Sequence, residues 1–127
     1  MKEAFRDVMQ FMRACDQPIG QHPAFPPSDR IGLRLSLNLE EMNEITTAIV
    51  KEDLEGVADG IADLVYVLLG MAVEFGIDLP AVWKQIQDAN IAKASAGKAP
   101  DGKQLKPDGW QPPDIASVLY PHIERRY

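Results

Sequence analysis

Two long stretches of helical apolar periodicity, separated by a short polar joint, constrain the fold of this chain more than any other feature. Residues 29–51 and 54–75 repeat apolar side chains at three- and four-residue spacing, which is typical of helices with a wide buried face. The leucines at the start of the first stretch also alternate as in a strand, but the length of the stretch favours a helix. Asp53 is a suitable N-cap for the second helix, and Gly76 is a suitable end. Because the joint is so short, we expect the two helices to be antiparallel neighbours.

Shorter predicted helices flank this pair. Residues 2–15 also carry apolar side chains at helical spacing, and Asp78 is a suitable N-cap for a further helix. A proline-rich arm, residues 17–27, precedes the first long helix. From residue 94 onward the chain is rich in glycine, proline and lysine, with one short helix expected at 115–120. The sequence thus predicts an all-α fold, an antiparallel bundle of four to five helices with an irregular, Lys/Pro-rich C-terminal section.

Length and charge limit the class of protein. The 127 residues, 46% of them apolar, suggest a single domain covering residues 1–127, with core helices at about 29–93 and a small core that dimerisation would complete. A formal net charge of −6 argues against nucleic-acid and anionic-membrane partners. The longest apolar stretch, residues 61–75, contains two carboxylates, and we expect it to be too short and too charged to span a bilayer. The single cysteine, Cys15, excludes an internal disulfide and favours a cytoplasmic protein.

Five carboxylates on the two long helices interrupt the apolar pattern. A helix turns about 100° per residue, which places Glu41 and Glu44 inside the apolar face of the first long helix and Glu40 at its edge. On the second long helix, Asp59 and Asp63 share one face at i, i+4 spacing. The antiparallel joint is expected to bring the two groups within reach of each other.

Carboxylates that converge in a partly buried site are either protonated or neutralised by a cation, because burial and mutual repulsion both raise their pKa values. A solvated acidic face and an interhelical salt bridge are simpler explanations of the pattern, but only Arg34 offers a positive charge on this face of the two helices. With no cysteine or histidine nearby, an all-oxygen ligand set favours Mg²⁺, or Mn²⁺ in its place. The candidate metal ligands are Glu41, Glu44, Asp59 and Asp63.

Three glycines lie inside the second long helix, at positions 56, 60 and 70. Glycine in a helix interior costs roughly 1 kcal/mol relative to alanine. We therefore expect another helix or a ligand to approach the chain closely at these positions.

Basic side chains are displaced from this acidic centre. Asn90 and Lys93 share a helical face at i, i+3 spacing, and four lysines fall within fourteen residues of a chain that is acidic as a whole. Carboxylates that hold a metal, together with lysines that hold an anion, are what a polyphosphate substrate requires. Plain loop solubility explains the tail lysines equally well. The candidate substrate-binding residues are Arg34, Asn90, Lys93, Lys98 and Lys106.

Several motifs resemble one enzyme superfamily. The pattern E-E-x-x-E at residues 40–44 is followed by the acidic segment DGIADLVYV, and DANIAK occupies residues 88–93. The tail contains DGKQLKPDGWQPPD. In this order and spacing the motifs resemble the all-α nucleoside triphosphate pyrophosphohydrolases, which include the MazG-like and phosphoribosyl-ATP pyrophosphohydrolase-like proteins. The resemblance covers roughly residues 30–115.

The resemblance implies a Mg²⁺-dependent enzyme that cleaves a nucleoside triphosphate between its α- and β-phosphates and releases a monophosphate and pyrophosphate. It also implies a homodimer or homotetramer whose subunits complete a four-helix bundle. By position, Glu41, Glu44 and Asp63 match the metal ligands of the superfamily. Glu40 matches a carboxylate that ligates the metal or orients water.

One position departs from the family pattern. The family often carries a glutamate three residues before Asp63, where this chain has Gly60. Asp59 is the natural substitute, which leaves open whether the site binds one metal ion or two.

The preferred hypothesis is a pyrophosphohydrolase that cleans the nucleotide pool of unwanted (d)NTPs, with Glu40 or Glu41 as the catalytic base that accepts the proton of the attacking water. One alternative is an enzyme that acts on phosphoribosyl-ATP. Two others are a non-catalytic helical dimer that binds nucleotide or metal and a purely structural helical partner. The pattern of residues does not specify the base or the sugar of the substrate.

Overall fold

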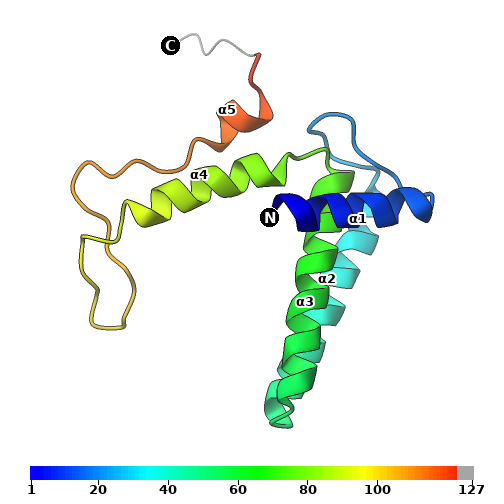
Figure 1. Ribbon diagram of the computed structural model, residues 1–127, viewed down its shortest axis with the longest axis horizontal. Helices are drawn as coiled ribbons and strands as arrows, with labels where there is room; N and C mark the ends of the chain where they lie inside the picture. Colours follow the sequence, from blue (N-terminus) through cyan, green and yellow to red (C-terminus); the bar gives the residue numbers. More distant parts are fainter. Residues whose placement is uncertain (123–127) are drawn as a thin grey trace. The chain divides into compact units, whose positions relative to one another are not determined.

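The computed structural model describes residues 1–122 and contains five helices in that range (Figure 1). Their bounds are α1 Lys2–Ala14, α2 Ser28–Val50, α3 Leu54–Glu74, α4 Leu79–Ile91 and α5 Ile115–Leu119. Within the described residues the only extended pairing is one isolated antiparallel bridge between Lys98 and Gln104. The predicted all-α fold is therefore confirmed, and the ends of the long helices lie within one residue of their predicted positions.

The chain divides into two compact units, Met1–Ile77 and the residues from Asp78 onward. In the first unit α2 and α3 run side by side as a helical hairpin, and α1 packs against α3 (Figure 1). In the second unit α4 is followed by an irregular segment and α5. The five candidate carboxylates all belong to the first unit, and the candidate residues from Asn90 onward belong to the second.

Local sequence explains where α3 begins and ends. The carboxylate of Asp53 accepts a hydrogen bond from the backbone N–H of Gly56 at 3.0 Å, as an N-cap does. At the other end, Gly76 adopts the left-handed conformation, with φ of +66°. The backbone N–H of Ile77 then bonds to the carbonyl of Ala72 at 2.9 Å, which closes the last turn. Both predicted boundary residues are thus confirmed.

Glycine allows the two helices of the hairpin to approach closely. A Cβ atom at Gly60 would lie 2.8 Å from Cγ1 of Ile45, which is buried on α2. A Cβ atom at Gly56 would lie 3.1 Å from that of Ala48, one turn closer to the joint. The expected close approach at these positions is confirmed, and the partner is the neighbouring helix.

The proline-rich arm is fixed against the C-terminal end of α3. The backbone N–H groups of Gly20 and Ala24 donate to the carbonyls of Val73 and Phe75, each at 3.0 Å. Phe25 also packs edge-on against Phe75, with ring centroids 5.8 Å apart. These contacts give the arm a defined path over α3 although it has no regular secondary structure.

Much of the apolar surface of the hairpin stays exposed in the single chain. Three side chains on its α2 part, those of Leu39, Met42 and Ile49, are each more than half exposed. The most apolar 18-residue window of α3 has a mean hydropathy of 1.7 and is 28% buried. The buried apolar residues of the first unit are Val8, Met12, Ile45, Ala48, Leu69, Ala72 and Val73.

Helix α3 is longer than the apolar stretch that the sequence singled out, and this corrects the expectation drawn from residues 61–75. By length and composition α3 is the one helix among the described residues that is long and apolar enough to cross a membrane. Core helices of proteins without membrane spans meet the same criteria. Here α3 packs against both α1 and α2 and ends on Glu74, whose carboxylate forms two ion pairs.

Candidate functional site: an acidic helical hairpin

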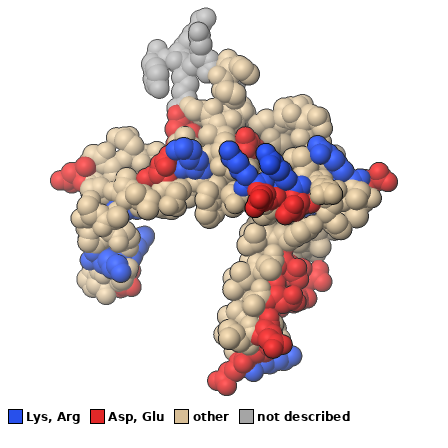
Figure 2. All heavy atoms as spheres, in the orientation of Figure 1, with Lys and Arg blue, Asp and Glu red and all other residues tan. Residues whose placement is uncertain are grey.

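Acidic side chains gather along the α2–α3 hairpin toward the joint between the two helices (Figure 2). Glu40, Glu41 and Glu44 come from α2, and Asp59 and Asp63 come from α3. The side chain of Glu41 is partly buried, and the other four residues are exposed. This arrangement follows from helical spacing together with the antiparallel joint.

Glu41 is the electrostatic centre of this cluster. Burial raises the pKa of Glu41, and the charges of Glu44, Asp63, Glu40 and Asp59 raise it further, in that order. One carboxylate oxygen of Glu41, Oε2, is buried and has no hydrogen-bond partner within the described part of the chain. The structure therefore brings the five carboxylates that the sequence singled out close enough for the other four to raise the pKa of Glu41.

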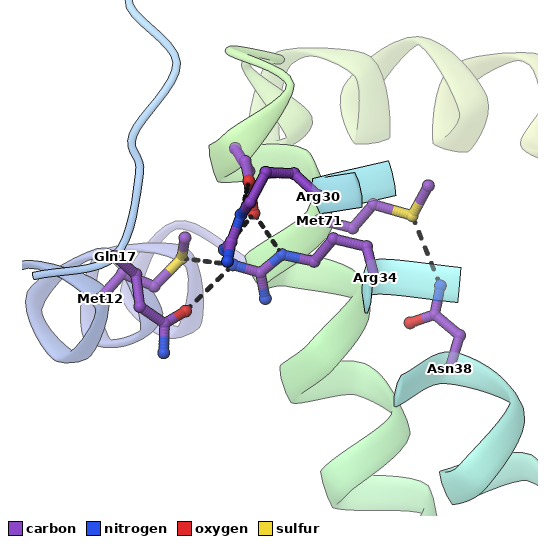
Figure 3. A network of polar contacts seen from close by, with 7 residues as sticks. Met12, Gln17, Arg30, Arg34, Asn38 and Met71 are labelled. Carbon is purple, nitrogen blue, oxygen red and sulfur yellow. Dashed lines mark hydrogen bonds and ion pairs between the residues drawn. The ribbon is translucent and has the colours of Figure 1, made fainter. Parts of the chain in front are cut away.

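Sequence reasoning overlooked Asn38, which lies one turn before Glu41 on α2. Its Oδ1 is the second buried side-chain acceptor without a partner among residues 1–122, and its amide nitrogen contacts Sδ of Met71 at 3.4 Å (Figure 3). Residues at i and i+3 on a helix lie on the same face. The i, i+3 spacing to Glu41 was readable in the sequence, but an asparagine on an apolar face gives no signal by itself.

The donor chemistry of the cluster fits a hard divalent cation. All of the side chains that converge offer oxygen, and one of these oxygens is buried without a donor. Within residues 1–122, no three carboxylate, histidine or cysteine groups stand close enough to form a ready-made coordination shell. Binding a cation would therefore require side chains of the exposed carboxylates to turn toward Glu41.

A cavity of about 650 Å³ opens beside the cluster on the first unit. Glu40, Glu44 and Asp59 line it, together with Asn43 and Lys51. The size is sufficient for a small-molecule ligand of nucleotide dimensions. Because its walls combine carboxylates with a single lysine, the cavity favours a ligand that brings its own cations.

Arg34, a candidate substrate-binding residue, is held in a buried ion-pair network at the far end of the hairpin (Figure 3). Its Nε lies 2.5 Å from Oε2 of Glu74, and its Nη2 donates to Oε1 of Gln17 at 3.1 Å. Arg30 reaches the same carboxylate, with Nε 2.6 Å from Oε1. Burial alone raises the pKa of Glu74, but the hydrogen bonds and charges of Arg30 and Arg34 outweigh it and hold the pKa below its ordinary value.

A second cavity, of about 240 Å³, lies where α1 meets the hairpin, and Arg34 is one of the residues that line it. Its walls are mainly apolar, with Gln17 and Tyr66 as polar members. The Nη1 group of Arg34 makes no hydrogen bond to another described residue, and a Cβ atom at Gly70 would lie 2.9 Å from it. Arg34 and Glu41 are seven residues apart on α2, or about 10 Å along the helix axis.

In the second unit, the predicted pair of Asn90 and Lys93 forms a direct contact. The ammonium group of Lys93 donates to Oδ1 of Asn90 at 2.9 Å. Lys98 is exposed and pairs through its backbone with Gln104. Lys106 lies over the ring of Trp110, with Nζ 4.6 Å from the ring centroid, and Lys93 lies over the same ring at 4.9 Å. Sequence reasoning did not identify Trp110, because no spacing rule connects it to Lys93.

Comparison with known families identifies the class of protein to which this all-α chain with two acidic helices belongs. A family model described as phosphoribosyl-ATP pyrophosphohydrolase matches residues 8–90, a span that includes all five carboxylates. The chain therefore belongs to the phosphoribosyl-ATP pyrophosphohydrolase family, part of the MazG-like all-α NTP pyrophosphohydrolase superfamily. The resemblance seen in the sequence motifs is confirmed.

One relative is an uncharacterised protein of Acanthamoeba polyphaga mimivirus. It is 33% identical over 79 residues, which are 59% of this chain and 32% of that protein. The chain thus spans about a third of the length of this relative.

Proposed function

We propose that this protein is a Mg²⁺-dependent pyrophosphohydrolase that converts a (d)NTP to the corresponding monophosphate and pyrophosphate, acting in the cytoplasm to clean the nucleotide pool. The observation that carries the proposal is the partly buried Glu41, whose pKa is raised by burial and by the charges of four other carboxylates and which has an oxygen without a partner among the described residues. The family match supports a pyrophosphohydrolase in general.

The cation would be held by Glu41, Glu44, Asp59 and Asp63. When bound, Mg²⁺ would supply charge that polarises the phosphate oxygens and lowers the pKa of a water molecule. Mn²⁺ has similar ligand preferences and is expected to substitute. The family often carries a glutamate at the position that Gly60 occupies here. In this proposal the shorter side chain of Asp59 takes the place of that glutamate.

Glu41 and Glu40 are the candidate bases. A carboxylate accepts a proton from the water as the water oxygen attacks phosphorus, and the P–O bond between the α- and β-phosphates breaks. The water oxygen stays on the nucleoside monophosphate, and the pyrophosphate leaves with the electron pair of the broken bond. The raised pKa of Glu41 supports this residue, because a base whose pKa is closer to neutrality accepts a proton more readily.

The cavity beside Arg34 is the proposed site for the nucleoside end of the substrate. Its apolar walls suit a flat heterocycle, and the free Nη1 donor of Arg34 suits a carbonyl or ring-nitrogen acceptor on the base. The axial distance of about 10 Å from Arg34 to Glu41 is appropriate for a nucleotide that spans both groups. The proposed anion-binding residues are Asn90, Lys93, Lys98 and Lys106, all of which belong to the second unit.

The direct test is incubation of the purified protein with Mg²⁺ and a panel of NTPs and dNTPs, with pyrophosphate and monophosphate as the measured products. We expect release of pyrophosphate from at least one nucleotide and none of orthophosphate. A Glu41→Gln variant is expected to lose activity, while Glu52→Gln, on the exposed joint, is the matched control. Failure to release pyrophosphate from any substrate would overturn the general proposal, and an active Glu41→Gln variant would overturn the assignment of Glu41.

Phosphoribosyl-ATP is a second candidate substrate, which the family match favours as strongly as any (d)NTP. It belongs in the same panel, and the substrate with the highest kcat/KM decides between the two roles. Nucleotide binding without turnover of any member would instead favour a non-catalytic binding protein.

We further propose that the active form is a homodimer or homotetramer. The support is the apolar surface that α2 and α3 leave exposed, since large exposed apolar patches mark interaction surfaces. Light scattering coupled to size-exclusion chromatography measures the mass directly. A monomer at the concentrations used for activity would exclude this part of the proposal.

A further inference from the structure

Trp110 is anchored to α4 by contacts that do not involve any lysine. Its indole Nε1 donates to the backbone carbonyl of Ala89, a buried residue near the end of α4, at 2.7 Å. The turn that precedes it is closed by a hydrogen bond from the N–H of Trp110 to the carbonyl of Pro107 at 3.1 Å. Gly109 supplies the left-handed residue of this turn, with φ of +74°. The ring therefore has a fixed position relative to the last turn of α4.

Two ammonium groups lie over this one ring. Nζ of Lys93 is 4.9 Å from the ring centroid and Nζ of Lys106 is 4.6 Å from it. Lys93 is further fixed by its bond to Oδ1 of Asn90, and its carbonyl accepts a hydrogen bond from Gln104 at 2.8 Å. Two lysines that are thirteen positions apart in the sequence thus share one aromatic partner.

These two charges are not neutralised within the described residues. No carboxylate of residues 1–122 lies within 4.0 Å of either ammonium group. An aromatic ring attracts a cation through its quadrupole but leaves the positive charge available to other ligands. A carboxylate in the same place would cancel that charge. An anion that contacts both ammonium groups would neutralise them, so each charge would contribute to its binding.

We propose that Trp110 is a positioning residue whose ring holds Lys93 and Lys106 together as a binding site for an inorganic diphosphate. A diphosphate distributes its charge over two phosphorus centres and can contact two ammonium groups at once. The amide nitrogen of Asn90, which has no acceptor among the described residues, supplies a third donor beside Lys93. The inference rests on the proposed function where the diphosphate is the pyrophosphate that leaves the substrate, but binding itself can be measured separately.

The test uses the full-length chain with Trp83→Phe, which leaves Trp110 as the only tryptophan. Inorganic pyrophosphate is titrated without divalent cations, and Trp110 fluorescence and calorimetry are recorded. We expect a saturable change in emission, because pyrophosphate bound to the two ammonium groups changes the charge next to the indole ring. Trp110→Leu and Lys106→Ala are each expected to raise the dissociation constant about tenfold or more. Trp110→Phe retains an aromatic face but not the hydrogen bond to Ala89. Its dissociation constant should lie between those of these two variants and that of the parent.

Lys103→Ala is the matched control, because Lys103 is an exposed lysine of the same segment and is not one of the two that lie over the ring of Trp110. It should change the dissociation constant by less than about twofold. Equal effects of Lys103→Ala and Lys106→Ala would show unspecific charge attraction and overturn the inference. Unchanged binding by both Lys106→Ala and Trp110→Leu would do so as well, and circular dichroism of each variant verifies that the helices remain.

This experiment separates the inference from the proposed function. Trp110-dependent binding of pyrophosphate by a protein that hydrolyses no nucleotide supports the site and contradicts the function. If the protein hydrolyses nucleotides but its binding of pyrophosphate does not depend on Trp110, the result supports the function and contradicts the site. For an active enzyme, Trp110→Phe should also weaken product inhibition by pyrophosphate, which a purely structural role of the ring would not change.

Discussion

Arg34 of α2 and Glu74 of α3 form an ion pair of 2.5 Å whose side chains are only 5% and 1% exposed. Forty residues separate them in the sequence. The pair joins the start of α2 to the end of α3, and Gln17 connects it to the end of α1. A buried pair of this kind holds three segments in one arrangement, because either charge alone would be strongly unfavourable in that environment.

Removing the charge of Glu74 should therefore destabilise the protein. Glu74→Gln leaves Arg34 buried without its counter-charge, and we expect the free energy of unfolding to fall by about 3–5 kcal/mol. Urea denaturation at neutral pH measures this change. Glu55→Gln, an exposed residue in the first turn of α3, is the control and should change stability by less than about 0.5 kcal/mol.

The same carboxylate predicts how stability depends on pH. The pKa of Glu74 is lower in the folded protein than in the unfolded chain, so its contribution is present above the ordinary glutamate pKa of about 4.3. That contribution is lost as the pH falls through the lower folded value. The stability of the parent protein should thus decline more steeply below this pH than that of Glu74→Gln. Parallel curves for the two proteins would contradict the lowered pKa.

The pKa of Glu41 predicts the opposite dependence of stability on pH. Its pKa is raised in the folded protein, so its contribution to stability is full below the ordinary glutamate pKa and is lost as the pH rises through the folded value. Without metal at neutral pH, Glu41→Gln should be more thermally stable than the parent protein. Thermal melts after treatment with a chelator measure this difference, with Glu52→Gln as the control.

Added Mg²⁺ should make the parent protein more thermally stable than Glu41→Gln. A cation that binds only the folded state raises the melting temperature, and the gain grows with its concentration. We expect a rise of several degrees for the parent protein and little or none for Glu41→Gln. Equal rises for both proteins would mean that the cation binds elsewhere.

Gly60 is predicted to be a packing requirement of the hairpin. Gly60→Ala places a Cβ atom 2.8 Å from Cγ1 of Ile45, and we expect a loss of about 1–3 kcal/mol from overpacking. Gly32→Ala is a matched control in α2, since nothing lies within 4 Å of the added atom, and it should be neutral or stabilising. The double variant Ile45→Ala/Gly60→Ala should show favourable coupling in denaturation experiments, whereas strict additivity would argue against the contact.

Gly70 should control the selectivity for the base. Gly70→Ala adds a carbon 2.9 Å from Nη1 of Arg34 and narrows the cavity of about 240 Å³. We expect KM for the best nucleotide to rise about tenfold and the ranking of bases to change, with the Mg²⁺-dependent gain in melting temperature retained. Steady-state kinetics over the nucleotide panel measures this, and an unchanged ranking would place the base elsewhere.

The acidic cluster could be predicted from the sequence because it depends on local geometry. Helical spacing fixed which faces carry Glu41, Glu44, Asp59 and Asp63, and a three-residue joint left only one way to bring those faces together. The sequence did not identify Asn38 as a candidate site residue. What marks Asn38 is a buried Oδ1 without a hydrogen-bond partner among the described residues, and that is a property of the packed structure.

The sequence by itself determined the helices, their caps at Asp53 and Asp78, the end of α3 at Gly76 and the convergence of carboxylates, because each depends on residues within a few turns or on one short joint. Only the tertiary structure decided that Arg34 pairs with Glu74. It alone also decided that Gly60 accommodates Ile45 and that two lysines share the ring of Trp110. These contacts join residues that are distant along the chain, and their existence depends on how closely whole segments approach. Pattern and spacing within one helix carry no information about that distance.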